Sequence, residues 1–341
     1  MERVEDTAGQ SRHNTMGDIR VGIDVSPLEL TGAGTARYLR HLLAALEREP
    51  GIELRRHRFP GSSRAAKVAR DTTWYLGALP FTARGEDVLH VPGHRGPLLS
   101  PAPLVVTVHD LAAFRHPETF NRWTRTYTRA LFPRLARSAT RVIAVSEFTA
   151  REAVELLGVE EDQIQVIPHG VEEPFTPTGP AAGGEYVLAV GTLEPRKNLP
   201  RVVLAAERSG VDVRVVGAPG WGDVDVESTG FVSDDELARL YRGAAALVYP
   251  SLYEGFGLPI LEAMASGTPV VTSHDGALAE LAGGAGVLVD PLDVEAIAAG
   301  IGEAMSRRAE LRDAGLERAR AFTWEAAAHA TAEVYREAAA A

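Results

Sequence analysis

The chain has 341 residues, of which 45% are hydrophobic and 24% charged, so it exceeds the usual size of one hydrophobic core and its composition excludes disordered and fibrous proteins. It contains no cysteine, which excludes disulfides and a cysteine nucleophile. The net charge of -11 lies in the second half, because residues 181–341 hold 13 basic and 24 acidic side chains against 22 of each in residues 1–180, and such a chain is not expected to bind nucleic acid.

Residues 1–17 are polar and aperiodic, which predicts a disordered leader. They lack the apolar core of a signal peptide. No apolar run elsewhere approaches the roughly 18 to 20 residues that are needed to cross a bilayer. We therefore expect a cytoplasmic protein.

Residues 18–176 show short apolar runs that alternate with helical segments. The runs are Arg20–Val25, Val88–Val91, Leu104–Val108, Arg141–Ser146 and Gln165–Pro168, and the helical segments are 35–46, 118–137 and 147–157. Continuous apolar strands separated by helices predict a parallel sheet that is covered on both faces. A loop over residues 27–34 follows the first strand and contains Gly32 and Gly34. Residues 18–176 are therefore expected to form a first domain.

The pattern is interrupted and then repeats. Residues 177–185 belong to an aperiodic stretch rich in Pro and Gly, which predicts an interdomain linker. Residues 186–323 predict a second domain, and residues 324–341 an Ala-rich terminal helix. The strands expected in the second domain are Tyr186–Gly191, Val211–Gly217, Ala246–Pro250, Pro269–Thr272 and Gly286–Asp290. The expected fold class is α/β, with two Rossmann-like doubly wound parallel-sheet domains that face a central cleft, where ligands bind beyond the carboxyl ends of the strands.

The densest candidate site follows the strand that ends at Pro250. Its residues are Glu254, Gly255, Phe256, Gly257, Leu258 and Glu262, and Pro259 suits the first position of a helix. Free N–H groups at a helix start bind anions, so a diphosphate is expected over residues 255–258. Glu262, in the first turn, is expected to bind a ribose, and Glu254 to lie nearer the sugar. The alternative is that both carboxylates only charge a helix start, and the Gly-rich loop with Pro259 argues against it.

A second candidate motif follows the strand that ends at Gly191. Thr192 comes next, and Arg196 and Lys197 stand at the start of the following helix. Cations there are unfavourable unless an anion neutralises them. A diphosphate is such an anion, and the two side chains would also stabilise its charge as it leaves. A solvated surface pair is the alternative.

These motifs together resemble the retaining glycosyltransferases of group 1, family 4, which have the GT-B fold. The resemblance rests on EPRKN (194–198), EGFGLPILEAMASGTPVV (254–271), VHDL (108–111), VSEFTA (145–150) and IPHGV (167–171), and it runs from about Arg20 through the terminal helix. It implies a retaining hexosyltransferase that moves a sugar from a nucleotide diphosphate to an acceptor hydroxyl. It also implies that residues 18–176 form the acceptor domain and residues 186–323 the nucleotide-sugar donor domain. Relatives with this EPRKN-type motif are often mannosyl- or rhamnosyltransferases, so GDP-mannose is the favoured co-substrate, a glycan or lipid-linked acceptor is expected, and no separate cofactor is needed.

The resemblance also implies roles for single residues. It places Lys197 on the donor diphosphate, Glu262 on the ribose and Glu254 at the donor sugar. It places Gly32 and Gly34 in a glycine loop that faces the phosphates. His109, which follows a buried strand at the cleft, matches a histidine at the sugar. The expected catalytic residues are His109, Glu254, Arg196 and Lys197.

The sequence departs from the family in two places. Thr192 stands where many relatives have Arg, so we expect Arg196 to substitute for it. The segment between Gly222 and Phe231 is shorter than in relatives, so the donor site for the base, near Gly230 and Phe231, is expected to be more open.

Three other functions are alternatives to a glycosyltransferase. A dinucleotide-binding enzyme would need G-x-G-x-x-G directly between strand and helix, and the loop at Gly32 and Gly34 does not match it. A glycosidase would use two carboxylates in a sugar groove, without Lys197 across a phosphate site. A catalytically silent sugar-nucleotide or glycan-binding protein of the same fold remains the alternative, because binding and chemistry share residues.

A metal site is not expected. The sequence DVD at Asp223–Asp225 resembles the metal-binding D-x-D of other glycosyltransferases, but it lies in the shortened loop, away from Glu254. No other cluster has metal-ligand spacing.

The stretch from Arg115 to Arg141 has seven arginines and one acidic residue, Glu118. Trp123, Tyr127 and Phe132 are interleaved, as in basic helices that lie on membranes. We therefore expect peripheral contact with the inner membrane face, and a solvated basic surface is the alternative.

Overall fold

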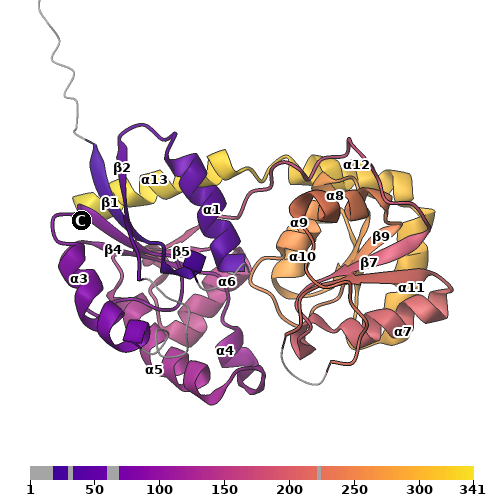
Figure 1. Ribbon diagram of the computed structural model, residues 1–341, viewed down its shortest axis with the longest axis horizontal. Helices are drawn as coiled ribbons and strands as arrows, with labels where there is room; N and C mark the ends of the chain where they lie inside the picture. The colour runs from indigo at the N-terminus through magenta and orange to yellow at the C-terminus, as the bar shows by residue number, and fades with distance from the viewer. Residues whose placement is uncertain (1–17, 30–33, 60–68, 221–223) are drawn as a thin grey trace, which may run out of the picture.

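The computed structural model describes residues 18–29, 34–59, 69–220 and 224–341. Within these residues the chain forms two lobes, each built on a parallel sheet, and they lie side by side (Figure 1). The leader at 1–17, Gly32 and Asp223 lie outside the described residues. The predicted fold class is confirmed, because both sheets are parallel and carry helices on both faces.

The first described sheet has six strands in the order β2-β1-β3-β4-β5-β6. The strands are β1 (Ile19–Asp24), β2 (Ile52–His57), β3 (Val88–Val91), β4 (Leu104–Val108), β5 (Arg141–Ala144) and β6 (Ile164–Val166). Its helical segments are η1 (Ser26–Glu29), α1 (Gly34–Leu46), η2 (Arg70–Ala78), α3 (Leu79–Thr82), α4 (Ala112–Arg115), η3 (Pro117–Thr119), α5 (Arg122–Ser138), α6 (Glu147–Glu152), η4 (Ala153–Leu157) and η5 (Glu161–Gln163). β3 and β4 are buried along their whole length, as expected for mainly apolar strands of a parallel sheet, and each carries one polar residue, His90 and Thr107.

The second described sheet has five strands in the order β11-β10-β9-β7-β8. The strands are β7 (Tyr186–Val190), β8 (Asp212–Val216), β9 (Ala246–Tyr249), β10 (Val270–Ser273) and β11 (Val287–Val289). The helical segments are η6 (Pro195–Lys197), α7 (Leu199–Ser209), α8 (Asp234–Gly243), α9 (Leu258–Ala265), α10 (Gly276–Ala282), α11 (Val294–Ser306) and α12 (Arg308–Ala319). All five strands predicted here are present.

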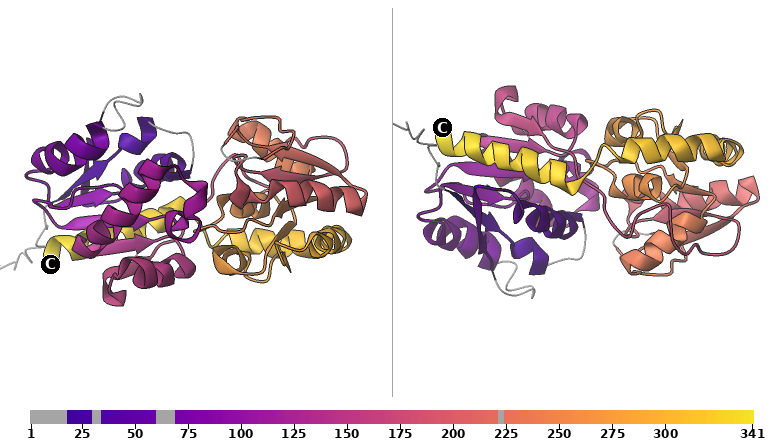
Figure 2. Two further views of the ribbon diagram at one scale, coloured as in Figure 1. Left: turned by 90° about the horizontal axis from the view of Figure 1, so that it is seen from below. Right: turned by 90° about the horizontal axis from the view of Figure 1, so that it is seen from above.

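The terminal helix α13 (Trp324–Ala340) leaves the second lobe and packs on the first (Figure 2). Its Trp324 belongs to the same apolar cluster as Tyr38 of α1. Its buried Tyr335 hydroxyl lies 2.7 Å from Nδ1 of His90, whose other ring nitrogen lies 2.8 Å from the Thr107 hydroxyl. The chain therefore crosses between the lobes twice, which fastens them to each other.

Each sheet has a point at which the order of successive strands reverses. This point lies between β7 and β9 in the second sheet and between β1 and β3 in the first. Loops that leave the carboxyl ends of such strands bind ligands in doubly wound proteins. Those loops carry the EPRKN and EGFG motifs on one side of the cleft, and Gly34 and His94 on the other.

The lobes touch at one end of this cleft. The hydroxyls of Ser146 and Thr149 donate to the carbonyl of Gly255, at 2.7 and 3.0 Å. The backbone N–H of Leu111 donates to the Tyr253 hydroxyl at 3.0 Å. These contacts bring the loop of residues 253–255 directly against the ends of β4 and β5.

Candidate active site

The two cations of the EPRKN motif converge on Glu254. The Lys197 ammonium lies 2.6 Å from one carboxylate oxygen, and the Arg196 guanidinium lies 2.9 Å from the other. Arg196 also pairs with Glu194 at 2.6 Å. Burial opposes ionisation of Glu254, but the two cations outweigh it and hold the pKa of this carboxyl at about 2. Thus the cations expected to need an anion are neutralised here by carboxylates of the protein itself, and they are not a solvated pair.

Local structure fixes the position of Lys197. Asn198 adopts a left-handed conformation with φ 61°, which asparagine tolerates better than most residues. Its side-chain amide donates to the carbonyls of Pro250 and Pro291 at 3.0 and 2.6 Å. This clamp joins the loop after β7 to the loops after β9 and β11. The side chain of Lys197 consequently packs over Gly191, where an added Cβ would lie 3.2 Å from Lys197 Cδ.

The loop before α9 presents unpaired backbone donors. None of the N–H groups of residues 255–258 has a hydrogen-bond partner in the described part of the chain. Gly257 is the N-cap of α9 with φ 110°, a conformation that requires glycine. With the positive end of the helix dipole, these donors form the anion site expected over Phe256, Gly257 and Leu258.

Gly255 is required as glycine by the contact between the two lobes. A Cβ at this position would lie 1.7 Å from the backbone oxygen of His109. This steric requirement was not expected from the sequence, and the prediction that Gly255 also belongs to the diphosphate site stays a prediction.

Glu262 is buried at the centre of the cleft. It is the fifth residue of α9 and not part of its first turn, which corrects the sequence prediction. Its carboxylate lies 2.7 Å from the Arg37 guanidinium of α1, in the other lobe, and accepts a hydrogen bond of 3.2 Å from Tyr241. Burial nevertheless raises the pKa of Glu262 to about 7, with Arg37 acting in the opposite direction. This carboxylate is thus available to a ligand hydroxyl only if Arg37 shares it.

The remaining predicted donor residues lie around this centre. Thr192 lies two residues after the end of β7 and is partly buried. Phe231 is 79% exposed, beside Gly230, which pairs with Gly217 at the end of β8. Gly34 begins α1, and a Cβ added to it would meet no described atom within 4 Å. Among the described residues, Gly34, expected to face the phosphates, and Phe231, expected near the base, are therefore not covered by other side chains.

His109 follows β4 at the cleft. The carbonyl of Pro92 accepts a hydrogen bond from the ring, while Nε2 is buried without a partner among the described residues. Burial lowers the pKa of His109 to about 4, so the imidazole is neutral at pH 7. A neutral ring that donates from Nδ1 offers the Nε2 lone pair to a hydroxyl group.

Three further residues line this site and were not predicted from the sequence, namely Arg37, Tyr249 and His94. Arg37 carried the same signal as Lys197, a cation near the start of a helix. Tyr249 ends β9, and its hydroxyl lies 2.7 Å from Lys197 and 2.9 Å from Glu254. His94 lies in the loop after β3, where the strand order predicts a crevice. Of these three residues, only Arg37 could have been inferred from the sequence, by the rule that a cation at a helix start needs an anionic partner.

The structure describes part of the DVD sequence and all of the basic stretch from Arg115 to Arg141. Asp225 is exposed, and no group of three or more potential metal ligands occurs among the described residues. In the basic stretch, Arg115 pairs with Glu152 at 2.6 Å. Phe132 is 1% exposed, whereas Trp123 is 50% exposed. Phe132 is therefore a core residue, and the prediction of an aromatic membrane face was wrong at this position.

Two facing doubly wound domains, with paired cations and an anion-binding helix start in one of them, define a two-domain enzyme of the GT-B type. The family described as Glycosyl transferases group 1 matches residues 172–322, and Glycosyltransferase Family 4 matches residues 25–173. The chain belongs to the group 1 glycosyl transferases.

Individual relatives agree with this assignment. The chain is similar to the O-antigen chain mannosyltransferase B of Escherichia coli, with 33% identity over 68% of this chain and 70% of that protein. It is similar to the MMP alpha-(1->4)-mannosyltransferase of Mycolicibacterium hassiacum, with 34% identity over 69% of this chain and 66% of the relative. Among solved structures, the sucrose-phosphate synthase of Thermosynechococcus elongatus shares the fold, with a TM-score of 0.73, 20% identity, and coverage of 94% and 98% of the two chains.

Proposed function

We propose that this enzyme transfers a mannose-like hexose from a nucleotide diphosphate sugar, with GDP-mannose as the favoured donor, to an acceptor hydroxyl with retention of configuration. Two relatives named as mannosyltransferases support the sugar. The α-linkage in the name of one of them supports retention, because GDP-mannose is itself an α-glycoside. The observation that carries the proposal is the convergence of Lys197 and Arg196 on Glu254 beside the open N–H groups of residues 255–258.

The geometry supports a division of labour. The diphosphate binds over the start of α9 and replaces Glu254 as the ion-pair partner of Lys197. The negative charge of the departing phosphate is then stabilised by this cation and by fixed N–H donors. Arg196 stays within reach of the same site, which is why no divalent metal ion is required. Glu254, released from one of its two cations, then faces the sugar.

Transfer proceeds by front-side attack. The acceptor hydroxyl approaches on the side of the leaving phosphate, and a phosphate oxygen takes its proton as the new glycosidic bond forms and the bond from the anomeric carbon to phosphate breaks. His109 Nε2 accepts a hydrogen bond from a sugar hydroxyl and holds the ring in place. Glu262 binds the ribose hydroxyls and acts through affinity.

The first experiment is a thermal-shift screen against GDP-, UDP-, ADP- and dTDP-sugars. A ligand that binds only the native state raises the unfolding temperature, so the true donor is expected to give the largest shift, and GDP-mannose is expected to be that donor. The screen also addresses the silent alternative when it is followed by an assay for released nucleotide. Binding without any nucleotide release, with or without acceptors, would favour a sugar-nucleotide-binding protein.

The acceptor is proposed to be a glycan or a lipid-linked glycan, used in the cytoplasm at the inner membrane face. No helix in the described parts of the chain is long and apolar enough to span a bilayer. Support for peripheral contact comes from α5, whose Trp123 is 50% exposed, and from the adjoining η2 and α3, where Leu76 and Phe81 are 52% and 65% exposed. Trp123 reaches η2 directly, because its indole donates to Asp71 at 3.2 Å.

A further inference from the structure

The hydroxyl of Tyr249 lies between Lys197 and Glu254, the ion pair of the proposed donor site. Tyr249 is the last residue of β9 and is 3% exposed. Its hydroxyl accepts a hydrogen bond of 2.7 Å from the Lys197 ammonium and donates one of 2.9 Å to the carboxylate of Glu254. Lys197 also donates directly to the same carboxylate oxygen at 2.6 Å. The three groups therefore contact one another in a closed triangle.

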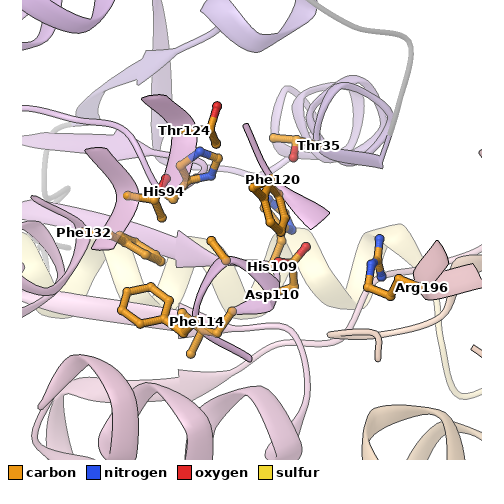
Figure 3. Close-up of a pocket in the computed structure, with 13 residues that line it drawn as sticks. Thr35, His94, His109, Asp110, Phe114, Phe120, Thr124, Phe132 and Arg196 are labelled. Atoms are coloured by element: carbon orange, nitrogen blue, oxygen red, sulfur yellow. The ribbon is translucent and has the colours of Figure 1, made fainter. Parts of the chain in front are cut away.

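The two oxygens of the Glu254 carboxylate have different partners. Lys197 and Tyr249 share one oxygen, and Arg196 pairs with the other at 2.9 Å. Arg196 also lines a cavity of about 200 Å³, where it lies across from His109 of the first lobe (Figure 3). Tyr249, by contrast, is buried, so it is placed to act through Glu254 and not by contact with a substrate.

Arg196 alone does not fix the orientation of Glu254. Its guanidinium also pairs with Glu194 at 2.6 Å and donates to the carbonyl of Tyr253 at 2.6 Å. The torsion that turns a glutamate carboxylate has only broad energy minima. A carboxylate that is held at one oxygen can therefore rotate, and a second contact at the other oxygen is needed to orient it.

The Tyr249 hydroxyl keeps its proton at neutral pH. Burial and the Glu254 carboxylate raise the pKa of Tyr249 to about 12, although Lys197 acts in the opposite direction. The proton is thus available to Glu254, while a lone pair of the same oxygen accepts from Lys197. A phenol can serve both neighbours at once, because it is a donor and an acceptor.

The proposed reaction changes the surroundings of Glu254. When a diphosphate replaces the carboxylate as the partner of Lys197, the direct contact between Lys197 and Glu254 is lost. In the described part of the chain, the Tyr249 hydroxyl is then the donor that remains on this oxygen. Its ring is packed in the apolar cluster that includes Leu247 and Ile260. Packing of this kind holds a functional group within the narrow limits that a reaction needs.

We propose that Tyr249 is a positioning residue for glycosyl transfer, whose hydroxyl holds the Glu254 carboxylate toward the sugar once Lys197 has left it. This inference rests on the proposed function and adds a residue that acts through Glu254. In the free enzyme Lys197 and Glu254 hold each other directly, so loss of the hydroxyl has little effect on donor binding. During the reaction that direct contact is absent, so the loss mainly lowers kcat.

Tyr249→Phe tests the role of the hydroxyl, because it keeps the ring and the contact of the Lys197 ammonium with the ring, 5.2 Å from its centre. Release of GDP from GDP-mannose, or of nucleotide from the donor with the largest thermal shift, is measured with p-nitrophenyl α-mannoside as acceptor. The variant is expected to lower kcat about tenfold and to raise the donor KM less than about threefold, as for the loss of one hydrogen bond to a charged group. An unchanged kcat contradicts the inference.

Two other buried tyrosines of the same apolar cluster serve as matched controls. Each donates a hydrogen bond through its hydroxyl, Tyr241 to Glu262 at 3.2 Å and Tyr186 to the carbonyl of Leu240 at 2.7 Å. Tyr186→Phe is expected to leave kcat and the donor KM unchanged, and Tyr241→Phe to change the donor KM more than kcat. A fall of kcat in Tyr186→Phe equal to that in Tyr249→Phe would show a general effect of core packing and contradicts the inference.

The route through Glu254 is tested by combining Tyr249→Phe with Glu254→Gln. The kcat of the double variant is expected to lie within about twofold of that of Glu254→Gln alone, because a residue that acts through Glu254 has no further effect once the carboxylate is gone. A kcat lowered by the product of the two single effects overturns the inference. Absence of nucleotide release by the wild type refutes the proposed transferase function instead.

Discussion

Glu254 is the carboxylate with which both cations of the EPRKN motif, Arg196 and Lys197, form ion pairs. Burial disfavours its charged form, and Arg196 and Lys197 reverse that preference, so its pKa falls to about 2. The pKa of Lys197 is raised, because the nearby Glu254 carboxylate outweighs the effect of burial. The cluster is thus fully ionised at neutral pH before a donor arrives. A diphosphate bound as proposed would redistribute contacts that already exist, which would reduce the reorganisation needed during the reaction.

Lys197→Ala is expected to abolish detectable donor binding without unfolding the protein. Arg196 remains beside Glu254 in this variant, so the carboxylate is not left as an isolated buried charge. Calorimetric titration with the best donor, together with a thermal melt, measures both properties. Arg208→Ala serves as control, because Arg208 lies in α7 and its pair with Glu295 is exposed. Wild-type donor affinity in Lys197→Ala would show that the diphosphate binds elsewhere.

Glu254→Gln and Glu262→Gln are expected to affect different kinetic constants. Glu254 is proposed to face the sugar, so its loss should lower kcat by about tenfold or more, with little change in the donor KM. Glu262 is proposed to bind the ribose, so its loss should raise the donor KM more than it lowers kcat. Steady-state kinetics at saturating acceptor separate the two effects. The same pattern in both variants would argue against separate roles.

Glu262 also predicts a pH dependence of stability. Its pKa in the folded protein, about 7, lies above the ordinary value of 4.5, so the folded state binds this proton more tightly than the unfolded state. The contribution of the Glu262 proton to the free energy of unfolding is complete below pH 4.5. It is lost as the pH rises to 7, and the loss is roughly 3 kcal/mol at most. Urea unfolding of wild type and Glu262→Gln at pH 5 and pH 7.5 measures it. The stability of the wild type relative to the variant is expected to fall between these pH values, and an equal difference at both would exclude the shift.

Among the elements, those defined by local sequence were predicted and those defined by distant contacts were not. Strands such as β4 and β9 were found because continuous apolar runs identify buried parallel strands. The edge strand β2 was missed, since its sequence IELRRH has no continuous apolar run and exposes Glu53, Arg55 and Arg56. The anion-binding start of α9 followed from Gly257 and Pro259. The packing of α13 on the first lobe and the contact of Arg37 with Glu262 depend on tertiary structure, which no local pattern specifies.

Helix α5 bears on the membrane question. Its buried face, including Phe132, belongs to the core, and Arg115 and Arg141, at either side of it, pair with Glu152 and Glu337. Arg122, Arg129 and Arg134 remain on the exposed side. The basic surface is therefore smaller than the sequence predicted, although it adjoins the exposed apolar side chains of η2 and α3.

Flotation with liposomes tests this surface directly. Binding to vesicles that contain anionic lipid is expected at low salt, with loss of binding at high salt, because the attraction to the surface is screened. Replacing Arg122, Arg129 and Arg134 by Gln should remove it, while the same change at Arg208 and Arg214 of the second domain should not. Failure of the wild type to float with anionic vesicles at low salt would rule out the membrane proposal.

At the scale of the whole molecule, both lobes contribute to each part of the site. Arg37 of the first lobe pairs with Glu262, Arg196 of the second lobe lines a cavity on the first-domain side of the cleft, and Gly255 abuts the backbone of His109. On the proposed function, donor and acceptor are expected to meet where the lobes meet. Exclusion of bulk water there would favour transfer over hydrolysis.

The complete reaction is expected to proceed without a metal ion and with retention of configuration. On the proposed function, Arg196, Lys197 and the N–H groups before α9 together take the place of the positive charge that a divalent ion provides in other phosphate sites. Activity should thus be unchanged in excess EDTA, measured as nucleotide release after the protein has been dialysed against the chelator. The anomeric configuration of the product, assigned by NMR, should match that of the donor, because acceptor and leaving phosphate occupy the same face of the sugar. Loss of activity in EDTA that is restored by Mg²⁺ or Mn²⁺ would direct attention back to Asp223–Asp225. An inverted product would exclude front-side attack and would require a base placed on the opposite face of the sugar.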